Sequence, residues 1–229
     1  MSVPFAVVLC GSGRADGSEI HEATAILFHL SRVGAAYRCY APDSPQAEVV
    51  NHATGKSAGG QTRNMLVEAA RIARGKIEPL SGLDVAHCRG VLFAGGFGVA
   101  KNLCTYATPG DKGGANCDVL PDVERVILGA HKAKKPLGLC CIAPVLAARV
   151  LGTRRGGPGV KVTLGNDAAA TEAVQTMGST HVARGVTEVF VDETNRVATT
   201  PAYMFGEASV AEVFEGIGKM VEAVVQMAT

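Results

Sequence analysis

Two adjacent cysteines, Cys140 and Cys141, end a short apolar run just before Pro144. The pattern predicts a buried strand over Leu137–Cys140 that turns sharply into a helix. A cysteine in such a turn lies beside the unpaired N–H groups of the helix start, which favour its thiolate form. We therefore expect a thiol with a lowered pKa that acts as a nucleophile.

The spacing of small residues does not decide which cysteine reacts. A sharp strand-to-helix turn needs small residues two positions before and two positions after its reactive side chain. Cys140 has Gly138 before it and Cys141 has Ala143 after it, so each meets half of the rule. The strand phase favours Cys141, because Cys140 still belongs to the buried strand. The alternative is that both are small core residues.

Two other turns that follow predicted strands carry residues suited to the same chemistry. Glu22 lies in the first turn of a predicted helix, Ile20–Arg32. It is either an ordinary first-turn carboxylate or a buried carboxyl that shares a proton with a thiolate. Gly95 and Gly96 follow the predicted strand Gly90–Ala94. They form either a tight turn or a pair of backbone donors for an oxyanion.

A histidine base is harder to identify. His181 alone follows the cysteine pair, and it is an auxiliary candidate whose alternative is an ordinary strand-end histidine. We expect the thiol to work with a carboxyl partner instead, with Cys140 as a second auxiliary residue.

The segment Gly11–Gly17 has the pattern G-x-G-x-x-x-G, one residue longer than the dinucleotide fingerprint. Asp43, after the second predicted strand, would then hold a ribose. We favour a flexible turn, because Asp16, Glu19 and Glu22 place negative charge where a pyrophosphate would bind.

Apolar runs bounded by glycine, proline or aspartate alternate with helical patterns along the chain. This alternation predicts βαβ units and a mostly parallel sheet with helices on both faces, so ligands should bind at the carboxyl ends of the strands. Strands are predicted at Phe5–Cys10, Ala36–Tyr40, Gly90–Ala94, Leu137–Cys140, Val160–Leu164, Val186–Val191 and Arg196–Thr200. Helices are predicted at Ile20–Arg32, Thr62–Ala73, Val119–Ala133, Val145–Val150, Ala168–Met177 and Ala208–Met227. Asp192–Asn195 predicts a small hairpin extension, and Thr108–Asp118 and Thr153–Gly159 predict surface insertions.

The 229 residues carry 22 Lys and Arg against 21 Asp and Glu. This length predicts a single domain over 1–229, and the balanced charge gives no support for nucleic acid or membrane partners. Seven cysteines without a C-x-x-C pair indicate free thiols in a reducing compartment, with no structural metal. A signal peptide pattern is missing, so the cytoplasm is expected, with the mitochondrion as the alternative if a transit segment has been removed.

Nine segments resemble the ElbB family, isoprenoid-biosynthesis proteins with an amidotransferase-like domain. They are Gly17–Ala23, Ala41–Asp43, Thr62–Asn64, Glu68–Gly75, Gly95–Gly98, Lys101–Leu103, Lys135–Gly138, Cys141–Pro144 and Thr199–Tyr203. This family belongs to the PfpI superfamily, which also contains the parkinsonism-associated deglycase. The resemblance implies a flavodoxin-like α/β sandwich and a homodimer. It also places the superfamily's nucleophile on Cys141, its glutamate on Glu22 and its oxyanion donors on Gly95 and Gly96.

The departures from the superfamily pattern narrow the chemistry. Ile142 stands where peptidase-like members have a histidine, and Gly165 stands where other relatives carry a later one. A His-x-Glu pair, which glutamine amidotransferases need, is also missing. We therefore expect a glyoxalase-like lyase that needs no cofactor and converts small 2-oxoaldehydes, such as methylglyoxal or glyoxal, to hydroxyacids. The alternative is a redox-sensing or metabolic accessory protein with an oxidisable cysteine and no catalytic activity.

Overall fold

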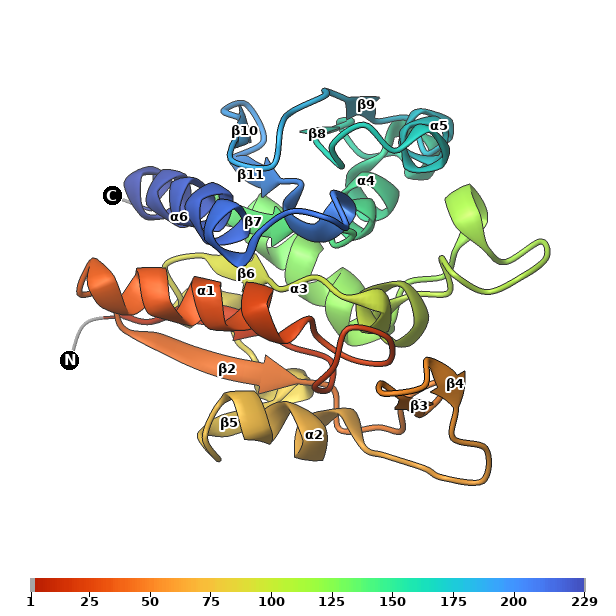
Figure 1. Cartoon of the computed structure of the whole chain (residues 1–229). Coiled ribbons are helices and arrows are strands. Elements are labelled where there is room, and N and C mark those ends of the chain that lie inside the picture. The colour runs from red at the N-terminus through yellow and green to blue at the C-terminus, as the bar shows by residue number, and fades with distance from the viewer. Residues whose placement is uncertain (1–2, 229) are drawn as a thin grey trace.

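A central sheet of seven strands organises the computed structural model, which describes residues 3–228 (Figure 1). Its strands, from one edge to the other, are β10 (Phe190–Asp192), β11 (Val197–Thr200), β7 (Leu137–Cys140), β6 (Val91–Phe93), β1 (Phe5–Val8), β2 (Tyr37–Ala41) and β5 (Ile77–Pro79). All neighbours are parallel except β10 and β11, which form the predicted hairpin. The chain continues from β1 to β2 on one side and later returns to β6 on the other. The carboxyl ends of β1 and β6 therefore form the switch point where ligands bind in such sheets.

The strand register brings the ends of four strands to one level. Phe93 in β6 aligns with Val8 in β1 and with Leu139 in β7, and Cys140 in β7 aligns with Thr200 in β11. The turns that follow β1, β6, β7 and β11 therefore meet along one edge of the sheet.

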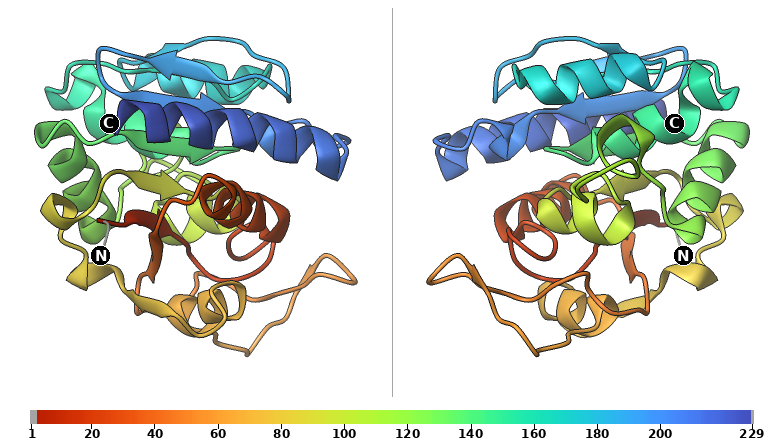
Figure 2. Two further views of the ribbon diagram at one scale, coloured as in Figure 1. Left: turned by 90° about the vertical axis from the view of Figure 1, so that its left-hand side faces the viewer. Right: turned by 90° about the vertical axis from the view of Figure 1, so that its right-hand side faces the viewer.

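Helices cover both faces of the sheet because successive strand residues point to opposite sides. Phe5 and Val7 of β1 pack in the core under α1 (Ile20–Arg32) and α6 (Val210–Met227). Ala6 and Val8 pack in the core under α3 (Pro121–Lys132) and α4 (Pro144–Leu151). Figure 2 shows α1 and α3 on opposite sides of the sheet. The predicted flavodoxin-like α/β fold is confirmed.

The remaining helices and strands lie at the periphery. Helix α2 (Met65–Ile72) packs beside β2 and β5, and α5 (Ala168–Thr176) packs beside α4. A small antiparallel pair, β3 (Val50–Asn51) and β4 (Lys56–Ser57), was not predicted. Neither was β5, nor a π-helical turn over Val99–Leu103.

The segment predicted as a strand at Val160–Leu164 differs from the expectation. Only β8 (Lys161–Val162) is extended there, and it pairs with β9 (Thr180–His181) outside the central sheet. Its neighbourhood is held to the β10–β11 hairpin by side chains, since the Lys161 N–H donates to Asp192 at 2.8 Å. Side-chain acceptors here take the place of a backbone ladder. Within residues 3–228, no helix is long and apolar enough to cross a bilayer.

Candidate functional site

Glu22, Gly95 and Cys141 come together at the carboxyl edge of the sheet. They follow β1, β6 and β7, which are adjacent strands. A Cβ atom added to Gly95 would lie closer than 3.0 Å to both Cys141 Cβ and Glu22 Oε2. The absence of a side chain at Gly95 therefore lets the thiol and the carboxyl approach each other.

Cys141 occupies a strained turn between β7 and α4. Its φ angle is 58°, in the left-handed region that residues other than glycine rarely adopt. Its N–H donates to the Thr200 carbonyl at 3.0 Å. Its residual exposure is 8%. Cys140 is the last residue of β7, is fully buried and donates its thiol to the Phe93 carbonyl at 3.6 Å. This geometry is typical of a nucleophile elbow and places Cys141, as the strand phase predicted, in the turn.

Glu22 is a fully buried acid rather than an ordinary first-turn carboxylate. The N-cap of α1 is Glu19, whose carboxylate accepts the Glu22 N–H at 2.8 Å. Glu22 Oε1 accepts the Tyr203 N–H at 3.1 Å, and Oε2 accepts the Cys140 thiol at 3.9 Å. The neighbouring Cys141 thiol and Gly95 N–H favour the ionised carboxylate and lower its pKa. Burial and, second, the Glu19 charge raise the pKa of Glu22 to about 8. Glu22 therefore carries a proton at neutral pH.

The expectation of a lowered pKa for the reactive thiol is wrong. Burial, followed by the negative charge that Glu22 acquires on ionisation, raises the pKa of Cys141 well above its ordinary value. The N–H groups of Gly96 and Ile142 oppose this rise, as the helix start was expected to do, but the loss of solvent outweighs them. At neutral pH the pair of Glu22 and Cys141 thus holds two protons, and the first leaves near pH 8.

The two glycines of the turn after β6 direct their backbone donors into this pair. The N–H of Gly95 lowers the pKa of Glu22, and the N–H of Gly96 lowers the pKa of Cys141. Gly96 has a φ angle of 102°, a conformation that favours glycine. The two donors thus stabilise negative charge on the carboxyl of Glu22 and on the sulfur of Cys141.

His181 lies outside this group. Its Nε2 accepts the Leu164 N–H at 3.1 Å, and burial lowers the pKa of its ring. The hydrogen bonds found across residues 3–228 do not join it to Cys141 or Glu22. The structure thus matches the ordinary strand-end histidine.

Tyr203 and His21 belong to the site but escaped the sequence analysis. The Tyr203 backbone binds Glu22, and its hydroxyl lies 2.9 Å from Nδ1 of His21. Tyr203 ends the segment Thr199–Tyr203, which carries part of the family resemblance and follows a strand at the same edge. That position was the available signal.

The glycine-rich segment Gly11–Gly17 binds its own chain. The N–H groups of Gly13, Ala15 and Gly17 donate to Ser18, His52 and Gly13 respectively. The Asp16 side chain is buried and accepts the Val50 N–H at 2.8 Å. These three donors are already used, which disfavours a phosphate site in the segment. Asp43 likewise accepts a hydrogen bond from the Asn64 amide at 2.8 Å.

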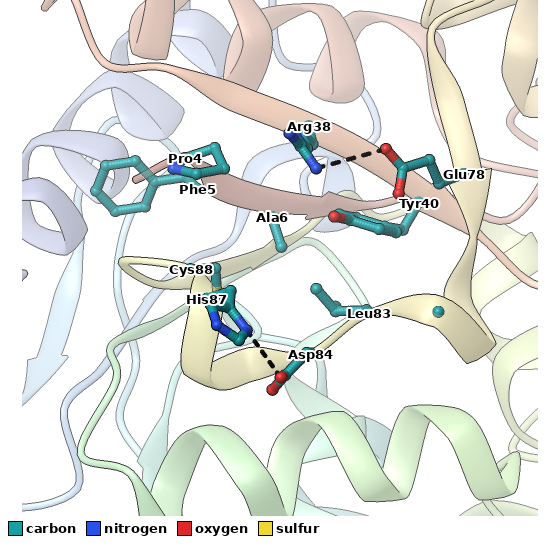
Figure 3. Close-up of a pocket in the computed structure, with 11 residues that line it drawn as sticks. Pro4, Phe5, Ala6, Arg38, Tyr40, Glu78, Leu83, Asp84, His87 and Cys88 are labelled. Atoms are coloured by element: carbon teal, nitrogen blue, oxygen red, sulfur yellow. Dashed lines mark hydrogen bonds and ion pairs between the residues drawn. The ribbon is translucent and has the colours of Figure 1, made fainter. Parts of the chain in front are cut away.

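A separate cavity of about 400 Å³ lies near the amino ends of β1 and β2 (Figure 3). Its polar side chains pair with one another: Arg38 with Glu78 at 3.7 Å, and His87 with Asp84 at 2.8 Å. Tyr40 lies between these two pairs. The cavity is at the opposite end of the strands from Cys141. Residues 3–228 contain no cluster of three or more side chains that could ligate a metal.

Comparison with known proteins shows two close mitochondrial relatives. The chain is similar to the mitochondrial ES1 protein homolog of Rattus norvegicus, with 48% identity over 97% of this chain and 83% of that protein. It is similar to the mitochondrial glutamine amidotransferase-like class 1 domain-containing protein 3 of Homo sapiens, with 47% identity over 99% of this chain and 86% of that protein. No family model matches the chain.

Solved structures agree with this relationship. A crystal structure of an isoprenoid biosynthesis protein with amidotransferase-like domain from Ehrlichia chaffeensis shares 33% identity, with a TM-score of 0.89 and full coverage of both chains. Drosophila melanogaster DJ-1beta shares the fold at 15% identity and a TM-score of 0.52, over 100% of this chain and 96% of that one. The chain therefore belongs to the ElbB family of isoprenoid-biosynthesis proteins with an amidotransferase-like domain.

Proposed function

We propose that the protein is a glyoxalase-like lyase that converts small 2-oxoaldehydes to hydroxyacids and needs no cofactor. One observation carries the proposal: a fully buried Glu22 lies beside Cys141, which occupies a strained turn, across the missing side chain of Gly95. A carboxyl with a pKa of about 8 both takes and gives a proton near neutral pH, as an isomerisation between adjacent carbons requires.

The first step is addition of Cys141 to the aldehyde carbon of methylglyoxal. The sulfur–carbon bond forms, the carbonyl π bond breaks, and the proton lost by the thiol ends on the aldehyde oxygen. The product is a hemithioacetal. The N–H of Gly96 lies beside the Cys141 sulfur and the N–H of Gly95 beside Glu22, and both would stabilise the developing oxyanion.

The second step moves a proton between the two carbons. Glu22 acts here in its ionised form, after it has released its own proton to solvent, which a pKa of about 8 permits for a fraction of the molecules near neutral pH. It takes the proton from the hemithioacetal carbon, the hydroxyl proton passes to the ketone oxygen through the enediol, and Glu22 returns its proton to the former ketone carbon. One carbon is oxidised to a thioester while its neighbour is reduced to an alcohol, so the electrons balance without another reagent. Water then hydrolyses the thioester, which releases lactate and restores the thiol.

Substitution of Cys141 tests the reaction. Purified Cys141→Ala should lose lactate formation from methylglyoxal, whereas Cys140→Ala should retain it because Cys140 lies in the strand. Unchanged turnover in Cys141→Ala would contradict the mechanism. Selective peroxide oxidation of Cys141 in a protein without turnover, detected by mass spectrometry, would instead support the redox-sensing alternative.

We also propose that the substrate is a small carbonyl compound, that the protein forms a homodimer and that it acts in mitochondria. The mitochondrial location rests on the names of the relatives from rat and human. The names of these relatives do not support the cytoplasmic location that was expected from the sequence. Sedimentation of the purified protein would test the dimer, and fractionation of the source cells would test the location.

A further inference from the structure

The turn after β11 brings a second strained residue to the site. Ala202 is fully buried and has a φ angle of 45°, which is rare for a residue with a side chain. This strained residue directly precedes Tyr203. The turn is also linked to the nucleophile, because the Thr200 carbonyl accepts the Cys141 N–H. Strain of this kind persists only where the surrounding structure holds it in place.

The strained turn aims one backbone donor at one oxygen of Glu22. The Tyr203 N–H donates to Oε1 at 3.1 Å. An oxygen that accepts this hydrogen bond is the poorer place for the acid proton, so the proton of neutral Glu22 belongs on Oε2. Oε2 is the oxygen beside the cysteines, 3.9 Å from Cys140 Sγ and next to the position of the missing Gly95 Cβ.

A side-chain hydrogen bond ties this turn to helix α1. His21 Nδ1 and the Tyr203 hydroxyl are 2.9 Å apart, although the residues are 182 positions apart in sequence. His21 is exposed and Tyr203 is half-buried, so the bond lies on the surface above Glu22 rather than in the core. It joins the residue that precedes Glu22 to the residue whose N–H binds Glu22.

We propose that Tyr203 and His21 form a latch, defined as these two residues and their hydrogen bond, which holds the Glu22 proton on Oε2, the oxygen beside Cys140 and Cys141. Both are positioning residues: Tyr203 acts through its backbone N–H, and His21 acts by holding the Tyr203 hydroxyl. Without the latch the turn is free to withdraw the N–H, and the proton is then shared between both oxygens. The role of the latch in turnover rests on the proposed function.

Several titratable groups face Glu22 and influence its pKa. They are Glu19 at the start of α1, Cys140 and Cys141 from the turn after β7, and Tyr203 from the turn after β11. The Tyr203 N–H lowers the pKa of Glu22, so loss of the latch should raise that pKa above its value of about 8. This direction does not depend on any turnover.

The test compares Tyr203→Phe and His21→Ala with the rescue variant His21→Asn, whose amide can replace Nδ1. Tyr37→Phe, an exposed tyrosine on β2, is the matched control. We expect kcat for methylglyoxal to fall by about three- to tenfold in Tyr203→Phe and His21→Ala, with KM unchanged, and to recover in His21→Asn. Infrared titration of the Glu22 carboxyl, assigned with Glu22→Gln, should show the raised pKa in the same two variants.

Each outcome separates the latch from the proposed function. A shifted infrared titration in a protein without methylglyoxal turnover would support the latch and overturn the lyase proposal. An unshifted titration in Tyr203→Phe would overturn the latch, whether or not the variant is less stable. Equal loss of kcat in His21→Ala and His21→Asn would also overturn it, because the hydrogen bond would then not be what matters.

Discussion

Two glycine-rich turns lie at the same edge of the sheet but do different work. The turn Gly95–Gly98 follows β6, and the turn Gly11–Gly17 follows the neighbouring strand β1. The first directs backbone N–H groups at Glu22 and Cys141. The second donates N–H groups locally, to Gly13 and Ser18, and to the side chain of His52.

The difference shows that a glycine pattern does not by itself make a binding site. Backbone donors are useful to a ligand or a reaction only where the folded chain leaves them pointing at reactive groups. The two turns are also packed together, since the Gly98 N–H donates to the Gly17 carbonyl at 3.0 Å. The turn after β1 therefore supports the turn after β6 from outside the site. We expect substitutions in the turn after β1 to lower stability alone, and substitutions in the turn after β6 to lower turnover as well.

The largest effect is expected from Glu22→Gln. Turnover should fall by roughly 10²- to 10⁴-fold, because an amide cannot carry the proton between carbons. The folded protein keeps the Glu22 proton up to a pKa of about 8, whereas the unfolded chain releases it near the ordinary value of 4.5. The stability from this proton is complete below pH 4.5 and is lost as pH rises through about 8.

The amide keeps that stability at high pH, so the free energy of unfolding of Glu22→Gln should exceed that of the wild type by roughly 5 kcal/mol at pH 9 and match it at pH 4. Urea unfolding at a series of pH values measures the difference. Exposed Glu207→Gln is the control and should follow the wild type. Parallel pH profiles for Glu22→Gln and wild type would show that Glu22 does not titrate as described.

Gly95→Ala is expected to have the next largest effect, and it tests the close approach of Glu22 and Cys141 at the turn after β6. Its Cβ would collide with Cys141 Cβ and Glu22 Oε2, so the pair must separate. We expect turnover to be lost and the free energy of unfolding to fall by about 1–3 kcal/mol. Chemical unfolding and a lactate assay measure the two effects. Gly59→Ala, which meets no atom within 4 Å, should change neither, and an active Gly95→Ala would show that the pair tolerates separation.

Asp16→Ala tests the turn after β1, where the carboxylate has a structural task. Removal of Asp16 leaves the buried Val50 N–H without its acceptor, which costs about 1–3 kcal/mol. We expect a lower melting temperature with nearly unchanged turnover per folded molecule. Loss of turnover at full stability would mean that this turn takes part in the reaction.

The smallest expected effect is the response of the turn after β1 to nucleotides. The N–H groups of Gly13, Ala15 and Gly17 are already bonded within the chain and the turn is rich in acidic side chains, so NAD(P) or ATP should leave the melting temperature unchanged. A melting temperature that rises with nucleotide concentration would contradict this prediction and restore the fingerprint interpretation of Gly11–Gly17.

Local periodicity predicted much of the framework. The helix Ile20–Arg32 has the predicted bounds because its apolar residues repeat with the helical period, and the strand Leu137–Cys140 has them because it is a continuous, bounded apolar run. The sharp turn at Cys141 followed from an apolar run that ends at a proline. These features depend on neighbours in sequence, so a single sequence contains them.

Tertiary structure decided the protonation of the site and the partners of its residues. A helix start favours a thiolate, but burial by distant segments raised the pKa of Cys141 instead. Glu22 owes its proton to the same burial and to Glu19. Tyr203 reaches Glu22 across 181 positions of sequence, a contact that no local pattern encodes. Desolvation and long-range contacts exist only once the chain has folded, which is why the sequence indicated where the site lies but not how its protons are held.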